Sequence, residues 1–599
     1  MARGFDDVPG SLPSDRVPKD FDISTVAFSK LAENALSKLT ESDIDDSALW
    51  RDHFSLTGEV RTFFGAAKIK KQWKFYSEER RPHSFQAGPA MIMRPAPETS
   101  WVDLSFTFLT SQRGKLVGNC SGTISFIPSD DGRGWKMWML RTILENFEGL
   151  GNPDDPSPIF VNPKVPNSMQ CEHDIAVLIV GAGQCGLSLA GRLGALGINY
   201  VLLEKAEEIG CSWTGKYDAV RQHTVREMNN LPFDRTYKDS DPTLLPAKTV
   251  AEGFQNYVKK YRINIWLAAN VESCVKNIEK PGWVVNVRRG EQKNLVKARH
   301  LVLSMGARQS VPKQPNVDNA ASFNGTILDI SAFKNSSRWS GKKGIVVGSA
   351  TSAHDVAQDM LDYGLVSVTM IQRDKTPVFP VEWIVAGQST IFNLEIPPTV
   401  ADRIDSTLPL KISREIPKCN FKTAFEVEKE RFDGLERAGF HVDRERPLYD
   451  GVLLRLGSYY IDVGTSARIA KGEIQVKSRD PIKRFVGRGL VFESGDILEA
   501  DLVVFATGYQ QDPRPQAASI VGHEVAQSMM TSKGLDEDGE FDRMMMPACP
   551  WAWIMGGAVS IARWNSRFIA LQIQAELLGQ PFPGCQWGEL VEGRNAVIE

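Results

Sequence analysis

Hydrophobic and polar positions along this chain change period in the same way at two places. Residues 176–180, AVLIV, form an apolar run that leads into small residues and then into leucines at helical spacing, at 189, 193 and 196. Residues 345–347, IVV, lead likewise into apolar positions at 353, 356, 357, 360 and 361. Both patterns predict a buried strand, a tight turn and an amphipathic helix.

Each of these units also ends in a similar way. Short alternating stretches are followed by an apolar strand that finishes in glycine, HLVLSMG at 300–306 and LVVFATG at 502–508. A repeated strand, turn, helix and closing strand is typical of dinucleotide-binding domains. The chain therefore predicts two Rossmann-type domains and an α/β fold.

The first 150 residues follow a different pattern. Apolar residues alternate at 102, 104, 106 and 108, and again in CSGTISFI and WKMWML, which predicts a curved antiparallel sheet packed by helices from the first 70 residues. The segment 151–168 contains five prolines and reads as a linker. Residues 380–450 predict amphipathic helices inserted into the second unit, and RFIALQIQAELLG predicts a closing helix.

The first turn carries the full dinucleotide fingerprint. Gly181, Gly183 and Gly186 stand in G-x-G-x-x-G directly after the strand, where the first glycine makes the turn, the second admits the pyrophosphate and the third lets helix and strand approach. The next strand ends in Glu204, 23 residues past Gly181, where a carboxylate can accept hydrogen bonds from a ribose diol. This unit is predicted to bind an adenine dinucleotide with a free ribose.

The second turn has an incomplete fingerprint. Gly348, Ala350 and Ala353 occupy the three places, so only Ala350 departs from G-x-G-x-x-G/A. The next strand ends in Arg373, 25 residues past Gly348, and a guanidinium there favours the 2′-phosphate of NADP(H). The alternative is that Arg373 is only a solvated charge at a strand end.

Composition narrows the class of protein. The 599 residues are 42% apolar and 24% charged with a formal net charge of −3, so the chain predicts a globular protein of roughly three or four units. That charge argues against a dedicated nucleic-acid binder. The first residues lack an apolar signal region, and no apolar run nears the roughly 18 residues of a membrane span, so a cytoplasmic location is expected.

Eight cysteines are scattered without a C-x-x-C pair, so neither a metal site nor an internal redox disulfide is predicted. With FAD on the first loop and NADPH on the second, the predicted chemistry is hydride transfer into a flavin. The electrons then go to another acceptor or to oxygen, and oxygen is the stronger candidate.

The residues also resemble a known family. VGAGQCG, GCSW at 210–213, RQHTVREMNNLPF at 221–233, TSAHDVAQD with IQR, YYIDVG at 459–464 and FATGYQ at 505–510 are similar to flavin-containing monooxygenases of the fungal and plant-auxin-type branch. RDHFSLTGEVRTFFG and WKMWMLRTIL resemble the NTF2-like α+β cone domain that often precedes the monooxygenase in that branch.

The resemblance implies a layout and a mechanism. Residues 1–165 would be the NTF2-like domain with its linker, 166–310 and 508–599 the two parts of a split FAD domain, and 311–507 the inserted NADPH domain. NADPH would reduce FAD, oxygen would add at flavin C4a to form a (hydro)peroxyflavin, and one oxygen atom would enter a small lipophilic metabolite. The partners expected are thus a small-molecule substrate and O2, with a homodimer possible.

Site residues follow from the same resemblance. Trp213 would lie near the flavin, with Gln184 and Lys205 in the flavin site. Ser349, Thr351 and Ser352 would contact the NADP pyrophosphate, and Thr507, Gly508 and Tyr509 would form a hinge-like segment between the nucleotide domains. The candidates for a catalytic role are Asp329, His223 and Tyr509. For His223, a purely structural role is expected at least as strongly as a catalytic one.

One motif departs from the family. In FNGTILDISAF, residues 323–333, the pattern F-x-G-x-x-x-H-x-x-x-[YFW] has Asp329 in place of histidine, and an anionic carboxylate changes any donor role there. The absence of a following Pro or Asp weakens assignment to Baeyer-Villiger enzymes, and SMG at 304–306 replaces the usual ATG. The alternatives are therefore an uncoupled NADPH oxidase or reductase, a ketone oxygenase, or a non-catalytic binding protein.

Overall fold

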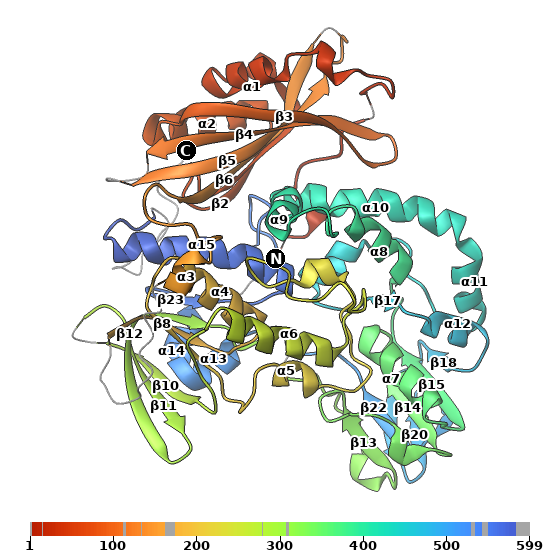
Figure 1. The fold of residues 1–599 in the computed structure, drawn as a ribbon. Helices are drawn as coiled ribbons and strands as arrows, with labels where there is room; N and C mark the ends of the chain where they lie inside the picture. The colour runs from red at the N-terminus through yellow and green to blue at the C-terminus, as the bar shows by residue number, and fades with distance from the viewer. Residues whose placement is uncertain are drawn as a thin grey trace.

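The computed structural model describes residues 3–14, 16–111, 116–132, 134–161, 174–277, 280–306, 311–528, 534–541 and 549–582. Three large sheets lie in these residues, one above and two below in Figure 1. The predicted boundaries at 165/166 and 310/311 fall outside the described residues. No helix in the described part of the chain is both long and apolar enough to span a membrane.

The N-terminal sheet has six strands in the order β2-β1-β6-β5-β4-β3. The strands are β1 (Ile44–His53), β2 (Val60–Phe64), β3 (His83–Ala96), β4 (Thr99–Ser111), β5 (Val117–Pro128) and β6 (Trp135–Phe147), accompanied by α1 (Phe28–Ser37) and α2 (Ala66–Arg80). The predicted antiparallel pairing is confirmed for β4, β5 and β6, the strands that contain the alternating stretches, whereas β1 pairs with β6 in parallel. Alternation along a strand reports its two faces and carries no information on the direction of its neighbour.

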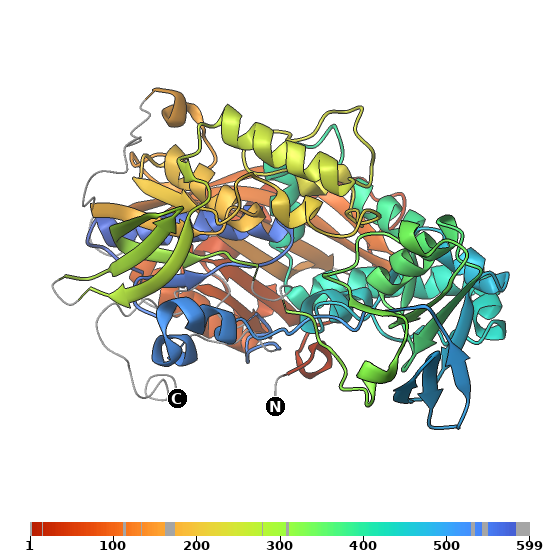
Figure 2. The ribbon, with the colours of Figure 1, turned by 90° about the horizontal axis from the view of Figure 1, so that it is seen from below.

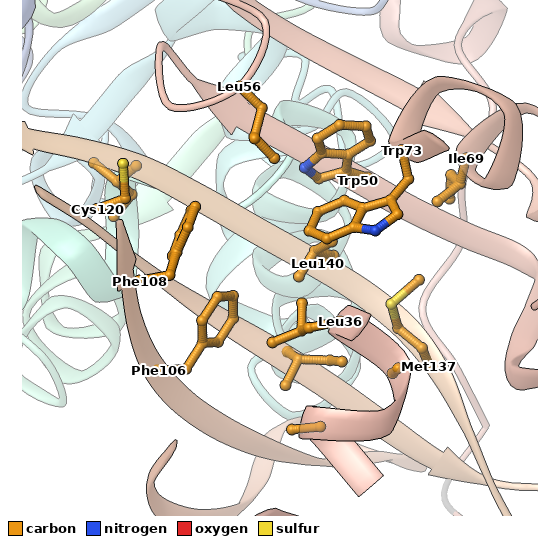
Figure 3. Close-up of a cluster of buried hydrophobic side chains, with 14 of the residues drawn as sticks. Leu36, Trp50, Leu56, Ile69, Trp73, Phe106, Phe108, Cys120, Met137 and Leu140 are labelled. Carbon is orange, nitrogen blue, oxygen red and sulfur yellow. The ribbon is translucent and has the colours of Figure 1, made fainter. Parts of the chain in front are cut away.

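The interior of this N-terminal unit is filled by side chains. Trp50 packs against Trp73 with ring centroids 5.3 Å apart, and Phe106 against Phe108 at 5.6 Å. Figure 3 shows these rings together with aliphatic residues from both helices and several strands. The indole N–H of Trp50 donates to Thr142 Oγ1 at 3.0 Å, so the buried polar atom is satisfied. The alternating apolar positions of the sequence therefore face a packed core.

The first Rossmann sheet has the order β10-β11-β12-β7-β8-β9, with β23 beside β12. Its strands are β7 (Asp174–Val180), β8 (Tyr200–Leu203), β9 (Ile265–Trp266), β10 (Asn270–Lys276), β11 (Trp283–Arg289), β12 (Gln292–Leu303) and β23 (Ala552–Ile554). The helices that accompany it are α4 (Gln184–Ala195), α5 (Cys211–Thr214), α6 (Ala247–Lys260), α13 (Arg514–Val521), α14 (His523–Ser528) and α15 (Val559–Leu577). Strands from opposite ends of the sequence thus share one sheet.

The second Rossmann sheet is wholly parallel, in the order β13-β22-β14-β15-β18. It comprises β13 (Thr326–Asp329), β14 (Lys343–Val347), β15 (Ser367–Gln372), β18 (Gln475–Ser478) and β22 (Leu502–Phe505), with α7 (Thr351–Asp362) and α12 (Thr465–Ala470). Shorter pairs are β16 (Val378–Pro380) with β17 (Tyr460–Asp462), and the set β19 (Ile482–Val486), β20 (Gly489–Phe492) and β21 (Ile497–Glu499). A continuous apolar run such as IVV is typical of a parallel strand buried on both faces.

The inserted segment 380–450 is helical, as its pattern predicts. It forms α8 (Val381–Ser389), α9 (Pro398–Ser406), α10 (Leu410–Val427) and α11 (Lys429–Arg437). Ile412 on α10 joins Leu49 and Trp138 of the N-terminal sheet in one buried cluster. The insertion therefore connects the second nucleotide unit to the N-terminal unit.

The closing helix α15 belongs to two cores at once. Its residues Ala562, Ile569 and Ile573 pack in the core of the first Rossmann sheet, while Trp564 and Phe568 pack in the core of the N-terminal unit. Figure 2, seen from below, shows this blue helix lying across the N-terminal strands. The long apolar pattern of the sequence is explained by burial on nearly all sides.

Buried ion pairs join the units around α15. Arg567 Nη2 lies 2.6 Å from Glu145 Oε2 on β6 and 3.0 Å from Asp154 Oδ2, and Arg403 of α9 pairs with the same two carboxylates. Burial alone would raise the pKa of Glu145, but Arg567 and Arg403 lower it to about 2. Asp154 lies in the segment 151–168, so the described part of this predicted linker is anchored, while 162–168 lie outside the described residues.

Candidate functional site

The first glycine loop has the geometry of a dinucleotide site. Gly181 adopts φ +100°, and a Cβ there would lie 2.6 Å from the Ser304 carbonyl oxygen; a Cβ on Gly186 would lie 2.0 Å from the Gly181 carbonyl oxygen. These two glycines are required by the fold itself. A Cβ on Gly183 would meet no described protein atom within 4 Å, so this glycine keeps space open at the start of α4.

The start of α4 suits an anion. No side chain caps this end of the helix, so its first backbone N–H groups face the space beside Gly183. The Nε2 group of the adjoining Gln184 donates to the Gly557 carbonyl at 3.1 Å, which ties the loop to the segment that precedes α15. These residues fit the pyrophosphate of a dinucleotide.

Glu204 follows β8 directly and is held in place by backbone groups. The N–H of Ala182 donates to its Oε2 at 2.9 Å and the N–H of Ala206 to its Oε1 at 2.9 Å. Each carboxylate oxygen keeps a further lone pair that can accept from a ribose hydroxyl. The neighbouring Lys205 is exposed. The strand and the carboxylate therefore lie where the sequence pattern predicts them.

Ser304 is the first residue of SMG at 304–306, where the related family usually has ATG, and its contacts give a physical reason for the serine. Its hydroxyl lies 2.7 Å from the Gly181 carbonyl oxygen and 2.9 Å from that of Val180, and the residue is buried. A serine at this position thus bonds to the glycine turn, which an alanine cannot do.

The second loop repeats the first with one methyl group added. Gly348 has φ +128°, and a Cβ there would lie 2.4 Å from the Ala506 carbonyl oxygen. Ala350 directly precedes α7, with φ −94° and ψ −177°, close to the φ −78° and ψ −171° of Gly183, which directly precedes α4. Ala353, in the third position, is completely buried. The backbone path is therefore preserved, and only the space beside Ala350 is reduced.

The hydroxyl groups of this loop already have protein partners. Ser349 Oγ lies 2.7 Å from Thr376 Oγ1, and Thr351 Oγ1 donates to the Tyr459 carbonyl at 3.2 Å. Ser352 Oγ lies 3.3 Å from the hydroxyl of Tyr217. These bonds orient the hydroxyls, and oxygens with free lone pairs or backbone N–H groups remain for a phosphate.

Arg373 follows β15 at the position that Glu204 occupies after β8. Its side chain is 91% exposed, and its Nε lies 2.8 Å from Asp374 Oδ2. An exposed pair of this kind is weak, so the guanidinium is available to a 2′-phosphate. The two Rossmann sheets thus present opposite charges at equivalent strand ends.

Trp213 and His223 lie on the chain between these loops. Trp213, on α5, packs partly buried against the core of the first Rossmann sheet, with Lys216 Nζ 4.9 Å from its ring centroid. Burial and the nearby charge of Arg221 lower the pKa of His223 to about 4, so its imidazole is neutral at neutral pH. A neutral imidazole can donate or accept a hydrogen bond and is a poor proton donor to substrate.

Asp329 lies near Tyr509, whose hydroxyl pKa is raised by burial and by the charge of that carboxylate. Asp329 accepts from Ser331 N at 2.8 Å, and also from Ser331 Oγ, Ala332 N and Gln314 Nε2. These bonds outweigh burial and lower the pKa of Asp329. The residue is an anionic acceptor that closes a turn after β13.

Two chain segments run antiparallel between the Rossmann sheets. Pro312 pairs with Tyr509, the N–H of Lys313 donates to the Gly508 carbonyl at 2.8 Å, and Thr507 Oγ1 donates to the Lys313 carbonyl. Gly508 has φ +84°. Within the described residues, His223 makes no hydrogen bond or ion pair with Asp329 or Tyr509, so the three catalytic candidates are only partly brought together.

Tyr217 and Asp355 were missed by the sequence analysis. The Tyr217 hydroxyl donates to Asp355 Oδ2 at 2.8 Å, and both residues are buried. Asp355 stands in the quoted stretch TSAHDVAQD, where an acid on the buried side of an amphipathic helix was the available signal. Nothing local in the sequence indicates its partner.

Comparison with known proteins agrees with this architecture. Residues 178–386 match the family described as pyridine nucleotide-disulphide oxidoreductase. The chain is 27% identical to indole-3-pyruvate monooxygenase YUCCA4 of Oryza sativa subsp. japonica, over 56% of this chain and 74% of that protein. It is 28% identical to indole-3-pyruvate monooxygenase YUCCA6 of Arabidopsis thaliana, over 56% and 76%.

Among solved structures, the fold is similar to a steroid monooxygenase bound to NADP, with a TM-score of 0.50 and 16% identity over 68% of this chain and 86% of that one. Two Rossmann sheets with two glycine loops are typical of oxidoreductases that bind two dinucleotides, and the matched family description agrees with that class. More narrowly, the sequence relatives are named as monooxygenases, and the chain is similar to them over more than half of its length.

Proposed function

We propose that this enzyme binds FAD at the Gly181 loop and NADPH at the Gly348 loop, and inserts one oxygen atom into a small lipophilic metabolite. The observation that carries the assignment is the pair of opposite charges at equivalent strand ends, Glu204 and Arg373. A carboxylate accepts from a free ribose diol and repels a 2′-phosphate, whereas a guanidinium binds that phosphate. Electrons would then pass from NADPH to FAD and on to oxygen, through a C4a-(hydro)peroxyflavin.

We also propose the domain assignment that this function needs. The FAD domain comprises 166–310 and 508–599, the NADPH domain comprises 311–507, and residues 1–165 form an NTF2-like unit. Support for the divided FAD domain comes from β23, which pairs with β12, and from α15, which packs on α4. The mixed sheet with α1 and α2 supports the assignment of the first unit.

The inserted helices are our candidates to line the substrate site. Val225, two residues beyond His223, packs with Phe392 and Ala401 of the insertion, and its N–H donates to Gln388 Oε1 on α8 at 3.0 Å. The insertion therefore lies against the chain segment that carries His223. The relatives are named for indole-3-pyruvate, so an aromatic 2-oxo acid belongs in the substrate panel beside amines, sulfides and ketones.

A second candidate function is an uncoupled NADPH oxidase, and Asp329 is the observation that favours it. An ionised carboxylate saturated by local donors cannot donate the hydrogen bond that a histidine offers at this position. If this function holds, peroxide release equals NADPH consumption with every substrate. Asp329→His should then lower the peroxide yield, and an unchanged yield would count against the idea.

The proposed function is tested with the purified yellow protein in two stages. Anaerobic NADPH should bleach the flavin, and oxygen should then give a transient oxygenated C4a-flavin spectrum. With 18O2 and the substrate panel, one product should gain one labelled oxygen atom. A folded protein that never binds flavin, or that never bleaches with NADPH, would disprove the proposal.

A further inference from the structure

The segment 213–220 connects the cores of the two Rossmann sheets. Trp213 packs against the core of the first sheet, whereas Tyr217 and Val220, only four and seven residues later, are buried in the core of the second. Lys334, which follows β13, donates to the Lys216 carbonyl at 2.9 Å. One short piece of chain from the proposed FAD domain is therefore fixed to the proposed NADPH domain.

Tyr217 makes the polar contact at the centre of this junction. Its hydroxyl donates to Asp355 Oδ2 at 2.8 Å and lies 3.3 Å from Ser352 Oγ. Ser352 and Asp355 are one turn apart on α7, whose first residue follows Ala350. The tyrosine thus contacts the same helix end that the proposed NADPH pyrophosphate would approach.

The bond is strong because its acceptor is charged under ordinary conditions. Burial raises the pKa of Asp355 to about 6, and the Tyr217 hydroxyl and the charge of Arg221 oppose that rise. At pH 8 the carboxylate is ionised. Hydrogen bonds to charged groups contribute more than neutral ones, and losing this donor would leave a buried carboxylate without its partner.

We infer that Tyr217, through Asp355, is a positioning residue that fixes the nicotinamide loop relative to the flavin. The inference rests on the proposed function, in which a hydride leaves C4 of NADPH, giving NADP+, and adds to N5 of FAD, giving reduced flavin. Hydride transfer depends steeply on the separation and alignment of the two reacting atoms. Tyr217 touches neither atom and acts through the helix end that it holds.

Stopped-flow reduction of the FAD-loaded enzyme by NADPH at pH 8, without oxygen, measures this effect. Tyr217→Phe should lower the limiting rate of flavin bleaching about tenfold, in line with the loss of one hydrogen bond to a charged group. The NADPH concentration for half-saturation should change far less. Asp355→Leu should behave in the same way, and Asp355→Asn, which keeps an acceptor oxygen, should recover most of the rate.

Tyr200→Phe is the matched control. Its hydroxyl is also buried and accepts from Asn264 N at 3.3 Å, but it lies within the first Rossmann sheet. Wild-type rates in both Tyr217→Phe and Asp355→Leu would overturn the inference. So would an equal slowing in Tyr200→Phe, or an Asp355→Asn variant as slow as Asp355→Leu. A wild-type enzyme that never bleaches would instead reject the proposed function itself.

Discussion

Gly183 and Ala350 have nearly the same backbone angles and differ by one methyl group. Neither needs a positive φ, so the glycine at 183 serves a ligand and the fold does not require it. Gly186, three residues later, has no such freedom, since a Cβ would lie 2.0 Å from a carbonyl oxygen.

Gly183→Ala should therefore leave the melting temperature of the FAD-free protein unchanged while lowering FAD affinity at least tenfold. Gly186→Ala should reduce folding itself, because the collision is with backbone that cannot move away cheaply. Flavin absorbance per protein and thermal melts of the FAD-free forms check both. Equal FAD affinity in Gly183→Ala and wild type would show that this space does not receive the pyrophosphate.

Arg373→Ala should raise the NADPH concentration for half-maximal flavin reduction while FAD stays bound. A guanidinium–phosphate interaction contributes about 2 kcal/mol, so the expected rise is roughly 30-fold for NADPH, with little change for NADH. Arg338→Ala, at another exposed arginine of the same unit, is the control. Equal losses with both nucleotides would remove the assignment of Arg373 to the 2′-phosphate.

Among single residues, the sequence predicts those whose position depends only on local geometry. The glycine turns, Glu204 and Arg373 follow from short spacings along one strand, turn and helix, and each lies where those spacings place it. Tyr217 and Asp355 are separated by 138 residues, and their bond depends on how two sheets are docked. No pattern within either segment contains that information.

Among the elements, α15 and α9 are joined to β6 by charge. Glu145 is the shared acceptor of Arg567 and Arg403, and its lowered pKa means that this bonding stabilises the folded state. The contribution is fully present above the ordinary pKa of about 4.5 and is lost as pH falls toward 2. Acid should therefore weaken this junction between about pH 4.5 and pH 2.

Glu145→Gln should destabilise the protein by about 3 kcal/mol, because the buried guanidinium of Arg567 and the partly buried one of Arg403 lose a charged partner. Denaturant unfolding at pH 7 measures the change, and the difference from wild type should shrink toward pH 2. Glu499→Gln, which breaks the exposed pair with Lys343, should leave the midpoint almost unchanged. A Glu145→Gln midpoint equal to that of wild type would show that the network contributes nothing.

Element type was more predictable than element neighbours. Period and turn residues predict the strands around both glycine loops and the helices of the insertion, since those signals are local. The parallel pairing of β1 with β6 depends on a crossover through α2, which alternation does not report. The burial of α15 in two cores could not be predicted either. An apolar pattern shows that a helix is buried but does not identify the elements that pack against it.

For the whole molecule, the N-terminal unit is packed against α15 of the first Rossmann unit and against the inserted helices. Removing residues 1–150 would expose Trp564, Phe568 and Leu571 of α15, all buried against that unit. Burial of three such side chains contributes on the order of 5 kcal/mol. The truncated protein should aggregate or melt at a clearly lower temperature, as size-exclusion chromatography and a thermal scan would show. A monodisperse fragment with the wild-type melting temperature would contradict this.

Because α15 lies near the end of the sequence, the core of the N-terminal unit cannot be completed until late in synthesis on the ribosome. The N-terminal strands are synthesised first, yet Trp564 and Phe568, which close their core, come more than 400 residues after the end of β6. At roughly 5–20 residues per second, this interval lasts roughly 20–80 s. During that time the nascent N-terminal unit exposes an apolar surface, so its yield in cells should depend on chaperones more than its final stability would suggest.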